Sequence, residues 1–199
     1  MNTHTIPYTK SPDWSSIPVI PLANMQWKVV EGIAASAQIC YTDDAIWLKL
    51  SARESPIVRR HTGPLGAPYE DSCLEFFFCP AENDHRYFNF EFNPNACLLL
   101  EIGSGRHDRT RLIVADPQVL FNPAAEISEN TWNITYKIPF HFIQRFFPSF
   151  SPCAGYKMYA NFFKCGHCTP HPHYLTWNLC CSPTPSFHSP NDFGLLIFG

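Results

Sequence analysis

Proline is the residue that most limits how this chain can fold. Nineteen prolines are spread from Pro7 to Pro190, and each one removes a backbone hydrogen-bond donor and fixes φ. Long helices are therefore excluded from most of the chain. Only residues 140–147 (FHFIQRFF), directly after Pro139, have helical spacing of apolar side chains, so we expect one short helix there.

Short segments rich in aromatic and β-branched residues lie between the prolines. Residues 37–41 and 45–51 flank a turn-like break at 42–44 and predict a hairpin, and residues 72–79 and 87–93 predict a second pair of strands. Further segments of this kind are 97–102, 111–114, 132–138, 156–163, 174–178 and 195–198. The pattern predicts one all-β domain over residues 1–199, an antiparallel β-sandwich of jelly-roll type, with an immunoglobulin-like sandwich as the alternative.

Composition excludes several functional classes. Hydrophobic residues make up 45% of the chain and charged residues 16%, so a large core is expected. The net charge of -3 argues against nucleic-acid binding. No apolar run reaches the ~18 residues of a membrane span, and the first residues lack the apolar stretch of a secretory signal. Nine irregularly spaced cysteines fit reduced thiols, and these features together predict a cytoplasmic protein without a membrane partner.

Strand alternation separates a polar face from the core. Successive side chains of a strand point to opposite faces, so Phe88 and Phe90 are predicted to face the core while Asn89 and Glu91 face away. The same reasoning places Glu75 on that second face. Carboxylates and amides beside aromatic rings suit a sugar, which offers hydroxyl groups at its edge and C–H groups on its faces. The same alternation is typical of any half-exposed antiparallel sheet.

An ordered set of motifs resembles the family 9 carbohydrate-binding modules and their stand-alone bacterial relatives. The match in order and spacing spans roughly residues 14–198. The motifs are 71–78 (DSCLEFFF), 87–94 (YFNFEFNP), 132–134 (WNI) leading to 138–139, 160–166 (ANFFKCG), 171–178 (HPHYLTWN) and 185–188 (PSFH) running into 193–194. The resemblance implies a β-sandwich that binds carbohydrate without catalysis, at the terminal sugar of a glucan or xylan chain.

The resemblance also implies a set of site residues. Trp177 and Tyr69 would be two rings that stack on the sugar. The groups that would bind its hydroxyls, with the further polar residues of the predicted site, are Glu75, Asn89, Glu91, Asn161, Lys164 and His173.

Two positions depart from the family pattern. Tyr69 stands where a tryptophan is expected, and Lys164 stands where arginine is usual. Lysine cannot make the planar two-pronged contact of a guanidinium group. No cofactor is required for binding, although the resemblance implies calcium with ligands that the sequence does not place. A separate glycan-degrading enzyme is the expected protein partner.

Glycoside hydrolysis is the first alternative function. It needs two carboxyl groups that flank the glycosidic bond, at ~5–5.5 Å or ~6.5–9.5 Å from each other. Glu75 and Glu91 are the candidates, since both are predicted to lie on one face.

A metal-stabilised scaffold is the second alternative. Cys165 and Cys168, followed by His171 and His173, offer thiolate and imidazole ligands of the kind that zinc prefers. A structural zinc site usually draws on two such pairs separated by a loop. Buried or half-buried free thiols are the competing interpretation.

Overall fold

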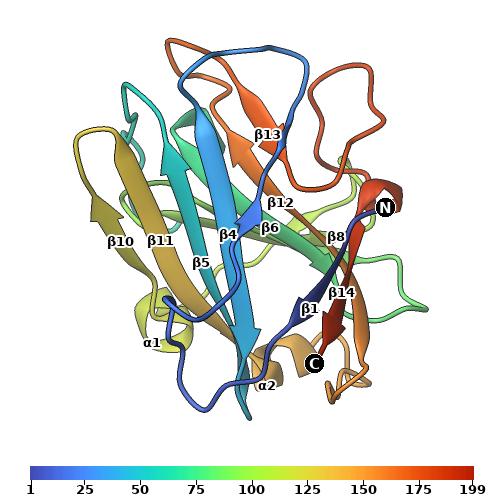
Figure 1. Cartoon of the computed structure of the whole chain (residues 1–199). Helices are drawn as coiled ribbons and strands as arrows, with labels where there is room; N and C mark the ends of the chain where they lie inside the picture. The colour runs from blue at the N-terminus through green and yellow to red at the C-terminus, as the bar shows by residue number, and fades with distance from the viewer.

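Two β-sheets pack face to face in the computed structural model, which describes all 199 residues (Figure 1). The larger sheet has nine strands. Seven of them run in the order β1 (Thr3–Ile6), β14 (Gly194–Phe198), β12 (Lys157–Cys165), β6 (Cys73–Cys79), β7 (Tyr87–Phe92), β8 (Leu98–Gly103) and β9 (Thr110–Arg111). The remaining two are β13 (Tyr174–Thr176), which pairs with β12, and β3 (Asn24–Met25), which pairs with β13.

The smaller sheet has five strands, visible at the left of Figure 1. Their order is β10 (Ala124–Ile127), β11 (Thr131–Pro139), β5 (Ala45–Arg53), β4 (Ala34–Tyr41) and β2 (Ile20–Pro21). Every strand pair in the two sheets is antiparallel except β1 with β14, which join the two ends of the chain in parallel. The predicted β-sandwich is confirmed.

The helices are all short, as the prolines require. Helix α2 (Phe140–Gln144) confirms the helix predicted after Pro139, and α1 (Pro117–Phe121) was not predicted. The side chain of Asp116 caps α1 by accepting a hydrogen bond from the Val119 backbone N–H. Two 3-10 helices, η1 (Pro68–Glu70) and η2 (Pro190–Asp192), complete the set. None of the helices is long and apolar enough to cross a bilayer.

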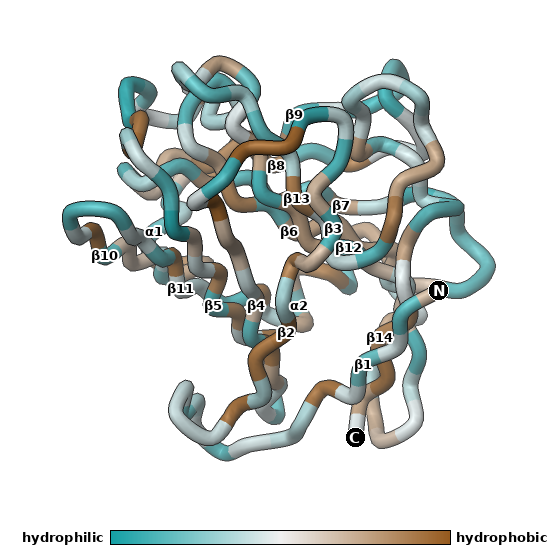
Figure 2. The backbone as a smooth tube through the Cα atoms, turned by 45° about the horizontal axis from the view of Figure 1, so that its top comes forward, coloured by the Kyte–Doolittle hydropathy of each residue, from teal (hydrophilic) through white to brown (hydrophobic).

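Both predicted hairpins are present. In the β4–β5 pair Ile39 lies opposite Leu48, and in the β6–β7 pair Phe76 lies opposite Phe90. Polar and apolar residues alternate along β7 and β11, whereas β6 and β14 are mostly apolar; Figure 2 shows the hydropathy along the whole chain. This alternation sends one set of side chains from each sheet into the space between the sheets, where they form the main core.

Aromatic rings fill most of that core. Phe76 stacks on Phe162 of the neighbouring strand with ring centroids 4.9 Å apart. From the opposite sheet, Tyr136 packs against Phe90 and Phe92. Burial of each such ring contributes about 1.5–3 kcal/mol, so the predicted Phe-rich face is the interior of the sandwich.

A long loop, residues 178–193, folds over the outer face of the larger sheet. Its Phe187 stacks on Phe163 of β12 at 4.2 Å between ring centroids and 12° between planes. The His188 Nδ1 atom lies 2.9 Å from the Tyr87 hydroxyl of β7. The loop therefore creates a second small core outside the sandwich and leaves a cavity beside it.

Candidate functional site

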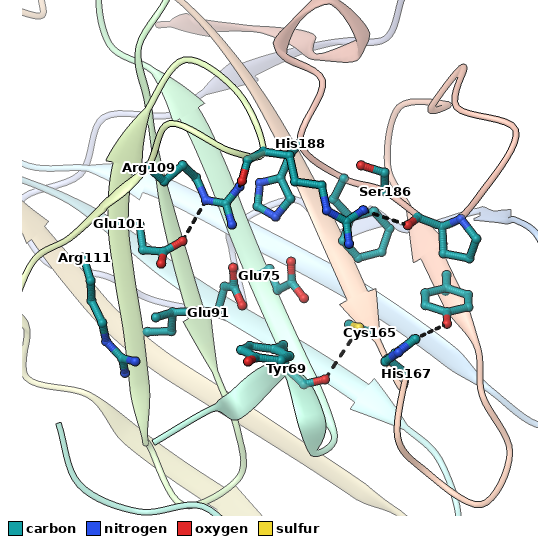
Figure 3. A pocket seen from close by; sticks show the side chains of 15 residues that line it. Tyr69, Glu75, Glu91, Glu101, Arg109, Arg111, Cys165, His167, Ser186 and His188 are labelled. Atoms are coloured by element: carbon teal, nitrogen blue, oxygen red, sulfur yellow. Dashed lines mark hydrogen bonds and ion pairs between the residues drawn. The ribbon is translucent and has the colours of Figure 1, made fainter. Parts of the chain in front are cut away.

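A cavity of about 440 Å³ opens on the outer face of the larger sheet, beside loop 178–193 (Figure 3). This volume lies within the ~300–1,000 Å³ of small-molecule sites. Strands β6, β7, β8 and β12 supply its floor through Glu75, Glu91, Leu99, Glu101 and Cys165. The walls and rim are Tyr69, Arg106, Arg109, Arg111, His167, Tyr174, Pro185, Ser186, Phe187 and His188.

Two carboxyl groups meet at the centre of the floor. Glu75 and Glu91 are direct partners in the β6–β7 register, and their side chains are 2% and 4% exposed. Asn89, on the same face of β7, donates from Nδ2 to Glu91 Oε1 at 2.9 Å and to Glu101 Oε2 at 3.3 Å. The predicted shared face for Glu75, Asn89 and Glu91 is therefore confirmed, although Asn89 is fully buried beneath the cavity and does not line it.

The surroundings of these carboxyl groups favour their protonated forms. Burial raises the pKa of Glu75 well above its usual value, and the neighbouring Glu91 raises it further. Burial also raises the pKa of Glu91 to about 7, against the opposing effect of the Asn89 hydrogen bond. The pair therefore keeps at least one proton near neutral pH. Such a pair can both donate and accept hydrogen bonds toward a ligand.

Three arginines stand above this acidic floor. Arg109 Nε is paired with Glu101 Oε2 at 2.7 Å. Arg111 Nη2 donates to the Gly66 carbonyl at 2.7 Å, and Arg106 Nη1 donates to the Pro185 carbonyl at 3.4 Å. These contacts use only part of the five donors of each guanidinium group. The cavity thus offers cationic donors at its rim, which our sequence analysis did not identify.

A sequence signal for these arginines exists. Residues 106–111 read RHDRTR, three arginines within six positions that run from the gap after predicted strand 97–102 to the first residue of predicted strand 111–114. Glu101 could also be predicted from alternation, because the register places it opposite Asn89. What the sequence does not show is that this segment folds back toward β6.

Tyr69 supplies the exposed aromatic surface of the cavity. It lies in η1, the short helix that ends directly before Asp71 and β6. Its side chain is 42% exposed, whereas Tyr174 and Phe187 in the same cavity are nearly covered. In Figure 3 its ring lies next to Glu91 and Glu75. Tyr69, Glu75 and Glu91 are the predicted site residues that the structure brings together.

The structure does not bring Trp177 to this cavity. Its ring packs edge-on against Phe162 in the main core, at 5.7 Å between centroids. A Cβ atom on Gly194 would come within 2.6 Å of this ring, so the backbone lies directly against it. The expected pair of stacking rings is therefore corrected to one exposed ring, that of Tyr69, because Trp177 packs as a core side chain.

Lys164 and His173 are also placed in the interior, around Glu54. Lys164 lies on the core side of β12 and its Nζ is 3.1 Å from Glu54 Oε2, while His173 Nε2 lies 3.6 Å from the same oxygen. Ser72 and Trp132 donate hydrogen bonds to this carboxylate. Burial, and then the charge of Lys164, lower the pKa of His173. These residues form a buried ion-pair cluster, away from the cavity.

Asn161 has a structural role as well. Its Oδ1 accepts hydrogen bonds from the backbone N–H groups of Phe162 and Asn178, at 3.0 and 2.9 Å. Its Nδ2 donates to the Asn178 carbonyl at 2.9 Å. Because these bonds use both ends of the amide, and two of them tie β12 to Asn178 after β13, the amide is not directed to a ligand.

The predicted zinc ligands do not form a cluster. Cys165 is buried at the cavity floor and Cys168 is exposed. His173 faces Glu54, and its Nδ1 is 2.7 Å from the His171 carbonyl. All nine cysteines are free. Calcium, for which no ligands were predicted, requires six to eight oxygen ligands and stays a prediction.

The fold and the cavity define a β-sandwich protein with a small-molecule pocket on the outer face of one sheet. The profile of Carbohydrate-binding family 9 matches residues 11–198, nearly the whole chain. The chain therefore belongs to Carbohydrate-binding family 9.

Solved structures share this fold. The chain is similar to a candidate carbohydrate-binding protein from Bacteroides uniformis ATCC 8492, with a TM-score of 0.84, 26% identity and coverage of 99% of each chain. It is also similar to a family 9 carbohydrate-binding module from Caldicellulosiruptor kristjanssonii in complex with glucose, with a TM-score of 0.70 and 11% identity over 100% of this chain and 96% of that one. The same organism's family 9 module in complex with cellotriose matches with a TM-score of 0.71 and 12% identity, over 99% and 93% of the two chains. No match was found among curated proteins.

Proposed function

We propose that this protein binds the terminal sugar of a glucan- or xylan-type oligosaccharide or polysaccharide, non-covalently, in the cavity on the larger sheet. The observation that carries the proposal is the exposed Tyr69 ring beside the buried carboxyl pair Glu75 and Glu91. The family supports it, because members of similar fold are bound to glucose and to cellotriose.

Each part of the cavity matches one part of a sugar. The Tyr69 ring would pack against the C–H face of the pyranose. Glu75 and Glu91 would hydrogen-bond adjacent hydroxyl groups, with one carboxyl donating and the other accepting. Arg111 would donate to ring or hydroxyl oxygens from the rim. With one stacking ring, most of the specificity must come from these polar contacts.

Calorimetric titration with glucose, xylose, cellotriose and xylan oligosaccharides tests the proposal. We expect at least one of these sugars to bind, and Tyr69→Ala to weaken binding about tenfold, which corresponds to ~1.4 kcal/mol. Tyr8→Ala is the matched control, because Tyr8 is equally exposed but hydrogen-bonds Asp43, outside the cavity. Absence of binding to every sugar, or equal affinities of the parent and Tyr69→Ala, would contradict the proposal.

Glycoside hydrolysis is the second candidate, because two carboxyl groups face the same cavity. Oxygen atoms of Glu75 and Glu91 lie within 4.8 Å of each other, which excludes the ~6.5–9.5 Å separation of inverting glycosidases and leaves the closer pairing of retaining ones. Turnover of aryl glycosides that is lost in both Glu75→Gln and Glu91→Gln would establish hydrolysis. Sugar binding without turnover would leave cleavage to a separate glycan-degrading enzyme.

A further inference from the structure

A buried thiol, that of Cys73, meets two carboxyl groups of the cavity floor, those of Glu75 and Glu91. One potential ligand atom each from Cys73, Glu75 and Glu91 lies within 4.8 Å of the other two, and all three residues are buried. The sheet imposes this arrangement. Cys73 and Glu75 are two positions apart on β6 and share its outer face, and Glu91 lies opposite Glu75 on β7.

Glu75 lacks the hydrogen-bond partners that a buried carboxyl group usually has. Glu75 is only 2% exposed, and the Cys73 thiol is the one hydrogen-bond donor that acts on its carboxyl group. Buried polar groups are normally satisfied by protein donors or by ordered molecules. Figure 3 shows the Glu75 carboxyl directed into the cavity, next to Glu91. Any partner for it beyond Cys73 must come from the cavity itself.

The chemistry of these three groups indicates which ligand they would bind. A thiolate with two carboxylates combines a soft ligand with hard oxygen ligands, a set that suits Zn²⁺ and is poor for Ca²⁺ or Mg²⁺. Three ionised ligands would leave a net negative charge around a divalent ion. Arg109 and Arg111 line the same cavity and offset it.

We propose that Cys73, Glu75 and Glu91 bind a divalent zinc-like metal ion at the floor of the cavity, with one coordination position open toward the cavity. Bond lengths of ~2.3 Å to sulfur and ~2.0–2.2 Å to oxygen place the ligand atoms of a tetrahedral site roughly 3.4–3.6 Å apart, and the three atoms here lie within 4.8 Å of one another before any metal binds. Binding displaces the proton of the thiol and those of the carboxyl groups to solvent. Three protein ligands and one open position are the pattern of accessible zinc sites.

This site differs from the cysteine and histidine set that the sequence suggested. Cys165 lies opposite Cys73 in the β12–β6 register, but its sulfur is not among the atoms that meet within 4.8 Å. Cys168 is exposed and lies outside the cavity. The two sets can therefore be separated by single substitutions.

Cobalt titration of the reduced, chelator-treated protein tests the site without any sugar. Thiolate coordination of Co²⁺ gives a sulfur-to-metal charge-transfer band in the near ultraviolet, and Zn²⁺ added afterwards should remove it. We expect Cys73→Ser to abolish the band. Glu75→Gln and Glu91→Gln should keep it but weaken Zn²⁺ binding by at least the ~10–100-fold that loss of an outer-shell group costs. Matched controls are Cys168→Ser and Cys40→Ser, which change an exposed thiol and a buried thiol outside the cavity.

The outcomes are distinct. A band that disappears only with Cys73→Ser, together with weakened Zn²⁺ binding in both glutamate variants, supports the site. No band in the parent, a band that survives in Cys73→Ser, or one lost in Cys168→Ser overturns it. Thermal unfolding of each variant shows whether it is folded, and the two glutamate variants keep the test valid if Cys73→Ser does not fold. Because the titration contains no carbohydrate, its result is independent of the proposed sugar binding.

Discussion

Single polar residues in the interior stabilise the fold, although their sequence context suggests ligand binding. Lys164 resembles a sugar-binding residue in sequence, yet its ammonium group lies 3.1 Å from Glu54 and is fully buried. Removing one partner of a buried ion pair costs ~3–5 kcal/mol, because the other charge is left without compensation. Lys164→Met should therefore lower the free energy of unfolding by about 3 kcal/mol in chemical denaturation.

Sugar affinity of the folded Lys164→Met variant should stay at the parent value. Lys157→Met is the matched control, since Lys157 lies on the same strand and is exposed. A loss of sugar affinity without a loss of stability would show that Lys164 contacts the ligand after all.

His188 makes stability depend on pH. Burial, and after it the nearby charges of Arg109, Arg106 and His107, lower the pKa of His188 from 6.5 to about 3. Between these values the unfolded chain binds a proton that the folded chain does not. The stability that the neutral His188 contributes to the folded state is therefore fully present above pH 6.5 and is lost as the pH falls.

At pH 5 the loss due to His188 should be roughly 1–2 kcal/mol, after allowing for water around a half-buried ring. Urea denaturation at pH 7 and pH 5 measures it. His188→Gln should reduce the difference between the two pH values, and exposed His85→Gln should not. Equal differences in the parent and His188→Gln would contradict the assignment.

The alternation of side chains along the strands predicted the two glutamates of the cavity floor, but it did not predict the buried ion-pair cluster around Glu54. It placed Glu75 and Glu91 together because adjacent strands in register share a face. The same alternation places Lys164 with Phe162, on the core side. A charged residue there is stable only with a partner, and that partner, Glu54, directly follows β5 of the opposite sheet. No local pattern in the sequence reveals such a long-range pair.

At the scale of elements, loop 178–193 over the larger sheet forms one wall of the cavity. Phe187 anchors this loop against Phe163, Trp27 and Tyr174. Phe187→Ala should remove about 3 kcal/mol of stability and weaken sugar binding, because Phe187 also forms a wall of the cavity. Leu179→Ala, in an exposed part of the same loop, should change neither. Unchanged stability and affinity in Phe187→Ala would mean that the loop does not hold the cavity open.

Elements with local signals were predictable, and elements defined by distant partners were not. The two hairpins have their turns and alternation within one stretch of sequence, and both are confirmed. Strand β1 exists because Thr3–Ile6 pairs with β14 at the other end of the chain. Helix α1 did have a local signal, Asp116 before Pro117, which is a capping residue followed by a favoured first helical position.

At the scale of the whole molecule, burial accounts for the low reactivity expected of most of the thiols. Six of the nine cysteines are buried, and Cys153, Cys168 and Cys181 are exposed. Burial raises the pKa of Cys40 to about 11, and that of Cys79 and of Cys180 to about 12. Because the thiolate is the reactive form, burial protects these groups both sterically and chemically.

A colorimetric thiol reagent should therefore react rapidly with three thiols in the native protein and with all nine after denaturation. The six protected thiols should become reactive together, at the denaturant concentration of global unfolding, if both cores unfold cooperatively. Earlier reaction of Cys73, Cys79, Cys165 and Cys180 than of Cys40 would show that loop 178–193 and the outer core open first. In that case sugar that occupies the cavity should delay the early reaction, because binding to the folded state stabilises the loop that covers it.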